Sequence, residues 1–265
     1  MSINPDALLT MIGPVPLSKA QDAFDKIADL LHRQIAVDDF TLSRIERMAR
    51  EGMPVDAVVA SQALALVAAH RWEIAALRSN FENAIRLNGE AAVYANYARA
   101  LTDVNDMRGA FDLMEIAARK EPENLAYLRA AVNWSFCAGF WEKTTELYRM
   151  LDLRTDASGS EAAGLVELVE LARVIGLRDE TVQNTIACAT QFLADRKVRV
   201  ASFSHSAEYS PADESIYFRL LVPVGRARAR ALDDELTPIL FDAVSDLQLD
   251  TFILTIESHP DHEPA

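Results

Sequence analysis

Residues 92–122, AVYANYARALTDVNDMRGAFDLMEIAARKEP, place small and aromatic apolar residues at a helical spacing, pause at Asn105 and Asp106, and then resume the spacing. This pattern predicts two helices joined by a short turn. Small side chains at Ala98 and Ala110 would let the two antiparallel helices approach each other closely. The stretch is therefore a helical hairpin, either half of a catalytic domain or one unit of a repeating scaffold.

A repeat unit of about 34 residues, counted from Ala91, gives these apolar residues fixed places. The places are Tyr94, Tyr97, Ala98 and Leu101 on the first helix, Ala110, Met114 and Ala117 on the second, and Pro122 at the end. This order resembles the tetratricopeptide repeat, which has a bulky residue, Leu, a small residue and Tyr on its first helix. Its second helix carries Ala, Phe and Ala and is followed by Pro. The resemblance favours a scaffold over half of a catalytic domain.

The resemblance covers roughly residues 55–155 and weakens away from the best unit. The preceding unit fits at Phe81, Ala84 and Leu87, but it needs one inserted residue and has Gly89 in place of Pro. The following unit fits at Leu128 and Tyr148, but Val132, Thr144 and Asp156 depart from the pattern. A generic helical bundle or another kind of solenoid remains an alternative.

Helical periodicity extends over the whole region up to about residue 195 and predicts ten helices. One helix begins near Leu17, the next covers about 38–50 and is closed by Gly52, and a very apolar one follows Pro54. The others are expected at 72–87, on both sides of the Asn105 turn, and at 123–138, 141–153, 159–177 and 179–196. Asp179 is a predicted N-cap of the last of these.

After residue 196 the period changes from helix to strand. Residues 197–207 alternate through Val198, Val200 and Phe203, and residues 215–224 are rich in strand formers. Residues 205–214 carry turn residues and predict a long loop between the two strands. A helical face follows and should kink or restart at Pro238, and residues 251–258 form a last strand. The fold class is therefore mainly α, with an all-helical repeat domain at 1–195 and a small ββαβ domain at 196–265.

The formal net charge of −14 makes nucleic acid and anionic membranes poor partners. No apolar stretch is long enough to span a bilayer, and prolines interrupt the apolar start of the chain, so we expect a cytoplasmic protein. The two cysteines lie outside any CxxC pattern. Neither phosphate-binding glycine loops nor an HExxH motif occurs, so we expect no cofactor and no metal.

Candidate site residues outside the repeats carry weaker signals. Ser204, His205, Ser206, Glu208, Asp213 and Glu214 could converge near a strand end for acid–base chemistry. The tail offers His259, Asp261, His262 and Glu263, but a proline-containing terminus is seldom folded around an ion. Arg226 and Arg230 share a helix face and are candidates for anion binding.

In tetratricopeptide proteins the first helices line an inner surface that binds extended peptides or partner helices. The resemblance therefore places Asn96, Arg99 and Asp103 of the best unit on that surface, with Arg129 and Asn133 of the next. Paired donor and acceptor groups of Asn can clamp a peptide backbone, and Arg can hold a carboxylate. We interpret the chain as an interaction scaffold that binds a protein or peptide.

Two other functions remain open from the sequence. One is an enzyme or ligand-binding module with its site near His205, in the C-terminal domain. The other is an acidic decoy, comparable to an immunity protein or an antitoxin, which the net charge favours. The ββαβ unit would cap the last repeat or provide a sheet edge for a homodimer.

Overall fold

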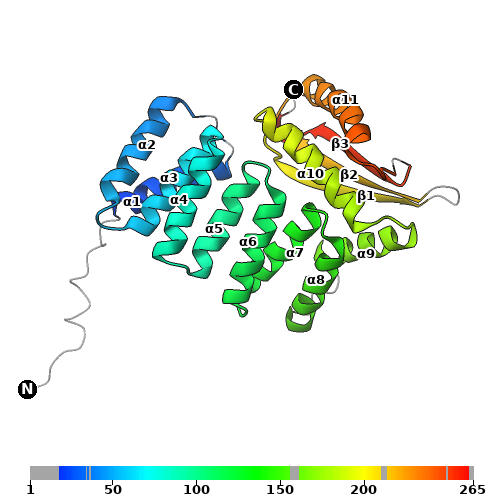
Figure 1. Cartoon of the computed structure of the whole chain (residues 1–265), viewed down its shortest axis with the longest axis horizontal. Coiled ribbons are helices and arrows are strands. Elements are labelled where there is room, and N and C mark those ends of the chain that lie inside the picture. Colours follow the sequence, from blue (N-terminus) through cyan, green and yellow to red (C-terminus); the bar gives the residue numbers. More distant parts are fainter. Residues whose placement is uncertain are drawn as a thin grey trace, which may run out of the picture.

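The computed structural model of the chain describes residues 18–33, 35, 37–155, 161–209, 214–248 and 250–262. These residues form a mainly α-helical protein with a small α+β unit at its C-terminal end, which confirms the predicted fold class (Figure 1). The first ten helices are α1 (Lys19–His32), α2 (Asp39–Gly52), α3 (Ala57–Arg71), α4 (Ile74–Leu87), α5 (Ala91–Thr102), α6 (Met107–Lys120), α7 (Leu125–Cys137), α8 (Trp141–Thr155), α9 (Glu161–Val174) and α10 (Asp179–Asp195). They are followed by β1 (Ser202–Tyr209), β2 (Glu214–Val222), α11 (Arg226–Ala243), β3 (Phe252–Ser258) and the short 3-10 helix η2 (Pro260–His262).

Neighbouring helices pack as antiparallel hairpins in the pairs α1–α2, α3–α4, α5–α6 and α7–α8. The second helix of each pair also packs on the first helix of the next, as α2 does on α3 and α4 on α5. The first helices contact each other as well, in the pairs α1–α3 and α3–α5. Figure 1 shows these hairpins following one another along an arc. The same packing relation thus recurs along the chain, as in a helical repeat.

The turn between α5 and α6 explains the pause in the opening stretch. Asn105 adopts a left-handed conformation with φ 62°, which Asn tolerates better than most residues. The carboxylate of Asp106 then accepts the Gly109 N–H at 2.9 Å and caps α6. Asn105 turns the chain after α5, and Asp106 starts α6.

Strand β1 pairs with β2 in antiparallel fashion, and β2 pairs with β3 in parallel. Helix α11 connects β2 to β3 along the chain. The predicted ββαβ order is confirmed, but β1 begins at Ser202 instead of near Val198 and extends through Tyr209. The residues from His205 to Tyr209, expected in a loop, pair with β2; His205 lies opposite Phe218. Helix α11 continues through Pro238 without a restart.

The sheet buries one face against the helices. Its buried side chains include Phe218 and Phe252, whose rings contact Phe136 of α7 and Trp141 of α8. One buried hydrophobic cluster therefore runs from α5 to β3, and a second fills α1–α5. The first cluster contains residues from both sides of position 195. The division into two domains at that position stays a prediction.

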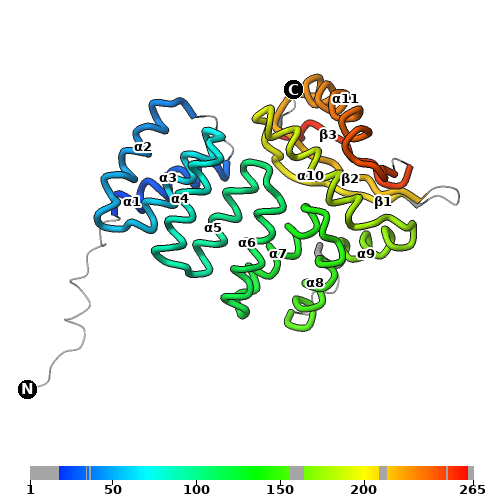
Figure 2. The backbone as a smooth tube through the Cα atoms, viewed as in Figure 1, coloured from blue at the N-terminus to red at the C-terminus, as the bar shows by residue number. Residues whose placement is uncertain are grey.

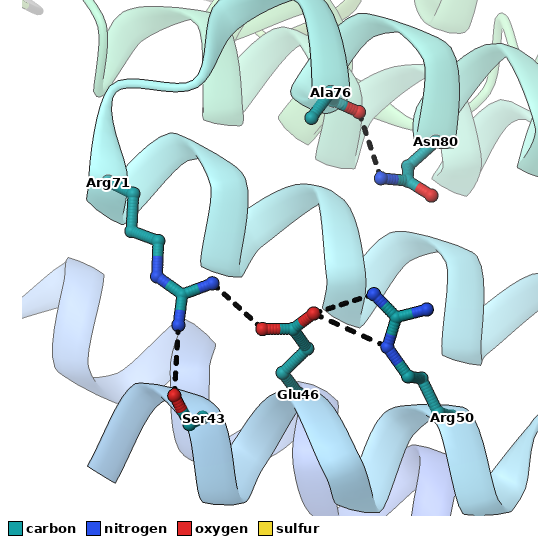
Figure 3. A network of polar contacts seen from close by, with 6 residues as sticks. All are labelled: Ser43, Glu46, Arg50, Arg71, Ala76 and Asn80. Atoms are coloured by element: carbon teal, nitrogen blue, oxygen red, sulfur yellow. Dashed lines mark hydrogen bonds and ion pairs between the residues drawn. The ribbon is translucent and has the colours of Figure 1, made fainter. Parts of the chain in front are cut away.

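The chain after α10 turns back toward the middle of the helical region, as the tube in Figure 2 shows. A separate polar network ties the early helices together (Figure 3). Glu46 of α2 accepts hydrogen bonds from Arg50 and from Arg71, at the end of α3, and Arg71 also donates to Ser43. Both arginines hold the pKa of Glu46 below its usual value. The carboxylate thus fixes the end of α3, where the returning chain binds.

Candidate functional site

Two cavities are lined by first helices of the hairpins. The α1–α5 cavity, of about 230 Å³, is lined by α1, α3 and α5 through residues such as Phe24, Leu66 and Asn96. The α5–β1 cavity, also about 230 Å³, is lined by α5, α7, α9 and β1. Arg99 and Asp103 line both cavities. We call the two cavities, which share these two residues, the groove.

Three of the predicted binding residues come from one face of α5, because positions 96, 99 and 103 are about one turn apart. Arg99 is exposed and its side chain lies at the junction of the two cavities. Asn96 is half-buried, and its Nδ2 donates to Oε1 of Gln62 on α3 at 2.8 Å. Asn96 therefore already contributes to helix packing, whereas Arg99 faces outward.

The other two predicted residues lie one turn apart on α7. Asn133 is exposed and lines the α5–β1 cavity beside Trp134. Arg129 is exposed on the same face of α7 but does not line either cavity of the groove. The structure therefore brings Arg99, Asp103 and Asn133 together around one cavity and leaves Arg129 beside it.

Asp103 ends α5 as its C-cap and is half-buried. Burial raises the pKa of its carboxyl group above the usual value, and the nearby positive charges of Arg99, Arg199 and His32 oppose this shift. The same groups balance the negative charge of Asp103 when it ionises. The groove thus has an exposed arginine at its centre and a compensated carboxylate next to it.

His205 lines the α5–β1 cavity from the other side. Its ring contacts the ring of Phe136 edge-on, with 5.1 Å between the centroids. Successive residues of a strand point to opposite faces, so Ser206 and Glu208 lie on the other face of the sheet. There Ser206 accepts a hydrogen bond from Arg219, and Glu208 accepts one from the Tyr217 hydroxyl. These residues of the proposed acid–base group do not converge on His205; Asp213 lies outside the described residues.

Sequence reasoning missed Arg199, which connects the C-terminal unit to two helix ends. Its Nε donates to the carbonyl of Asp103 at 2.9 Å, and its Nη2 donates to the carbonyls of Ala69 and His70, each at 3.1 Å. These carbonyls belong to the ends of α5 and α3, where a cation is favourable. The Ala69 carbonyl also accepts the Trp72 N–H at 3.2 Å. The alternation of apolar residues around Arg199 predicted a strand and did not indicate that Arg199 binds the ends of two helices.

Asn105 makes the second connection and was noticed in the sequence only as a turn residue. Its Nδ2 donates to the carbonyl of Val198 at 2.8 Å, and its Oδ1 accepts the N–H of Val200 at 2.9 Å. The side-chain amide therefore pairs with the backbone as a neighbouring strand would. Residues 198–200 bind this amide, which explains why β1 starts only at Ser202.

Arg226 and Arg230 lie four positions apart on α11, and both are exposed. They border a shallow depression of about 420 Å³ together with Asp233 and Glu257. Two carboxylates beside two guanidinium groups leave little net positive charge for an anion. The proposed anion site is therefore a mixed-charge surface.

Within the described residues, no group of three or more His, Cys, Asp or Glu side chains is placed to hold a metal ion. None of the helices described is both long and apolar enough to cross a bilayer. Comparisons of the chain with protein-family models, with curated proteins and with solved structures find no match.

Proposed function

We propose that the chain is a tetratricopeptide-like interaction scaffold that binds an extended segment of a partner protein in the groove. The observation that carries this proposal is the shared cavity of Arg99, Asp103 and Asn133. The resemblance assigns these residues to the inner surface of two successive units, and they line one cavity. Binding would need no chemistry from the chain, only a surface held in shape by stacked hairpins.

The groove offers the partner three kinds of contact. Trp134 and Phe203 supply apolar area, Asn133 supplies an amide that can bond a peptide backbone, and Arg99 supplies an exposed charge. Aromatic and arginine side chains are the residue types that contribute most to binding at protein interfaces. The composition of the groove therefore suits a peptide segment.

The test uses peptides selected from a displayed library of random sequences, with affinities measured by titration calorimetry. Arg99→Glu and Asn133→Ala should each weaken binding of the selected peptides by about tenfold or more, because both residues line the cavity. The matched control is Arg119→Glu on the second helix α6, where Arg119 is 68% exposed. This variant changes the net charge as Arg99→Glu does and should leave the affinity unchanged.

Two results would contradict the proposed function. One is a library that yields no peptide binding to the intact chain. The other is a set of peptides that lose equal affinity with Arg119→Glu and with Arg99→Glu, because such peptides would respond to net charge and not to the groove.

A further inference from the structure

The two edges of the sheet are covered differently. Helix α11 packs on β3, and the carboxylate of Asp233 accepts the Ile256 N–H at 2.8 Å. Ile256 of β3 lies opposite Leu220 of β2 in the parallel ladder. The acceptor of the Ile256 N–H, Asp233, belongs to α11. The β3 side is therefore occupied by this chain itself, by a helix and by a specific side-chain acceptor.

Strand β1 forms the other edge. In the sheet that the structure describes, β2 is its one hydrogen-bonded neighbour, and the sheet ends there. The backbone of an edge strand presents unpaired N–H and C=O groups at alternate residues, which can bind a further strand. Native proteins usually cover or block such an edge, as this chain does for β3.

The edge strand also belongs to the groove. Ser202, Phe203 and His205 of β1 line the α5–β1 cavity, as Arg99 and Asn133 do. Residues Ser202 to Ala207 are each half-buried. A peptide lying along β1 would therefore have its backbone beside a strand and its side chains beside the helices α5 and α7.

We infer that the bound partner segment adds to the sheet as a strand along β1, with apolar residues at alternate positions and an acidic side chain facing Arg99. This inference rests on the proposed function and specifies the conformation and charge of the occupant. Strand addition supplies affinity through main-chain hydrogen bonds, and pockets for alternate side chains supply selectivity. We expect the bound segment to be about as long as β1, which has 8 residues.

The surroundings of the cavity favour these side chains. Trp134, Leu165 and Phe203 provide the apolar part of the lining. The exposed cation is Arg99, whereas Asp103 is surrounded by Arg199 and His32 as well as by Arg99. A carboxylate of the partner thus meets a positive group in a chain whose overall charge is −14.

A second copy of the chain is the competing occupant of the β1 edge. Two copies would each bring a net charge of −14, and Glu208 is exposed near the end of the strand. Repulsion between like charges disfavours this pairing at low ionic strength. A partner segment whose acidic residue is placed against Arg99 suffers this repulsion less.

The experiment measures amide hydrogen exchange by NMR in the full chain, with and without a peptide selected from the random library. We expect exchange to slow by about tenfold or more at every second residue of β1 when the peptide binds. The amide of Ile256 is the internal control, because Asp233 already holds it in the free chain. Alanine in place of the acidic residue of the peptide should weaken its binding to wild type but not to Arg99→Ala.

Each outcome decides between the two proposals. A peptide that depends on Arg99 but leaves the β1 amides unchanged would overturn strand addition and leave the proposed function standing. Alternate protection of β1 without peptide, together with a dimer in sedimentation, would assign the edge to a second copy and overturn the inference. Peptides that bind independently of Arg99 would instead contradict the proposed function.

Discussion

The side chains of Asn105 and Arg199 join the segment before β1 to the ends of α3 and α5 through hydrogen bonds. Asn105 is 4% exposed and pairs with the backbone on both sides of Arg199. Arg199 then reaches the ends of α3 and α5. These two residues make five hydrogen bonds, which position β1 at the edge of the groove; the partners are Val198, Val200, Asp103, Ala69 and His70.

At the residue scale, we predict that Asn105→Ala destabilises the protein by about 2–4 kcal/mol. The substitution leaves the buried Val200 N–H without an acceptor and puts alanine at a positive φ. Asn105→Gly is the matched control, since glycine removes the same hydrogen bonds but accepts the backbone conformation. The free energy of unfolding measured in urea should therefore be highest for wild type, lower for Asn105→Gly and lowest for Asn105→Ala. Equal stability of all three proteins would show that the pairing with Val198 and Val200 contributes nothing.

At the element scale, two turns between helices place a glycine at positive φ. Gly139, with φ 81°, joins α7 to α8 and lies against α10, where an added Cβ would come within 2.8 Å of the Gln183 backbone. Gly176, with φ 74°, joins α9 to α10 and has open space around it. The two glycines therefore share a conformation but differ in their surroundings.

We predict that Gly139→Ala and Gly176→Ala each cost about 1–2 kcal/mol for the left-handed conformation. Gly139→Ala should cost roughly 1–3 kcal/mol more, because the methyl group pushes the α7–α8 turn away from α10. The difference between the two variants, measured by urea unfolding, isolates this contact. Identical losses would mean that α10 moves aside without cost.

Element positions were largely predictable because the helices keep an apolar face at regular spacing. The turn at Asn105 and Asp106 was predicted from a pause in the helical spacing, and the ββαβ order from the change of period after residue 196. The role of Asp179 was not: it was expected to cap α10, but its carboxylate accepts the Glu142 N–H of α8 at 2.9 Å. A cap from another element depends on the tertiary arrangement, which local periodicity does not contain.

The candidate site was predictable only in part, for the same reason. Helical spacing put Arg99 and Asp103 on one face of α5, and the repeat resemblance added Asn133. The contributions of Arg199 and of β1 to the site join positions far apart in the chain. Arg199, for example, bonds a carbonyl 130 residues earlier, at Ala69. Such contacts leave no periodic signal.

At the scale of the whole molecule, the shared hydrophobic cluster links the sheet to the repeats. Phe136 and Trp141 stack on each other with 5.2 Å between ring centroids, and both rings also contact the sheet. A fragment of residues 1–195 would expose these rings to water. The C-terminal unit therefore contributes to the stability of α7 and α8.

We predict that the 1–195 fragment loses the near-ultraviolet circular dichroism of Trp141 and melts at a lower temperature than the full chain. The full-length control Phe218→Ala removes one ring of the cluster and should cost about 3–5 kcal/mol while keeping the fold. A fragment that melts cooperatively at the temperature of the full chain would instead support independent domains divided at residue 195.

The hydrogen bond between Asn105 and Val198 also imposes an order on folding. The two partners are 93 residues apart, so closing this loop is entropically expensive until intervening helices have formed. During synthesis the early hairpins emerge first and can assemble from local contacts while the last quarter of the chain is still being made. We therefore expect the helical hairpins of the newly made protein to form before Arg199 binds the carbonyls at the ends of α3 and α5.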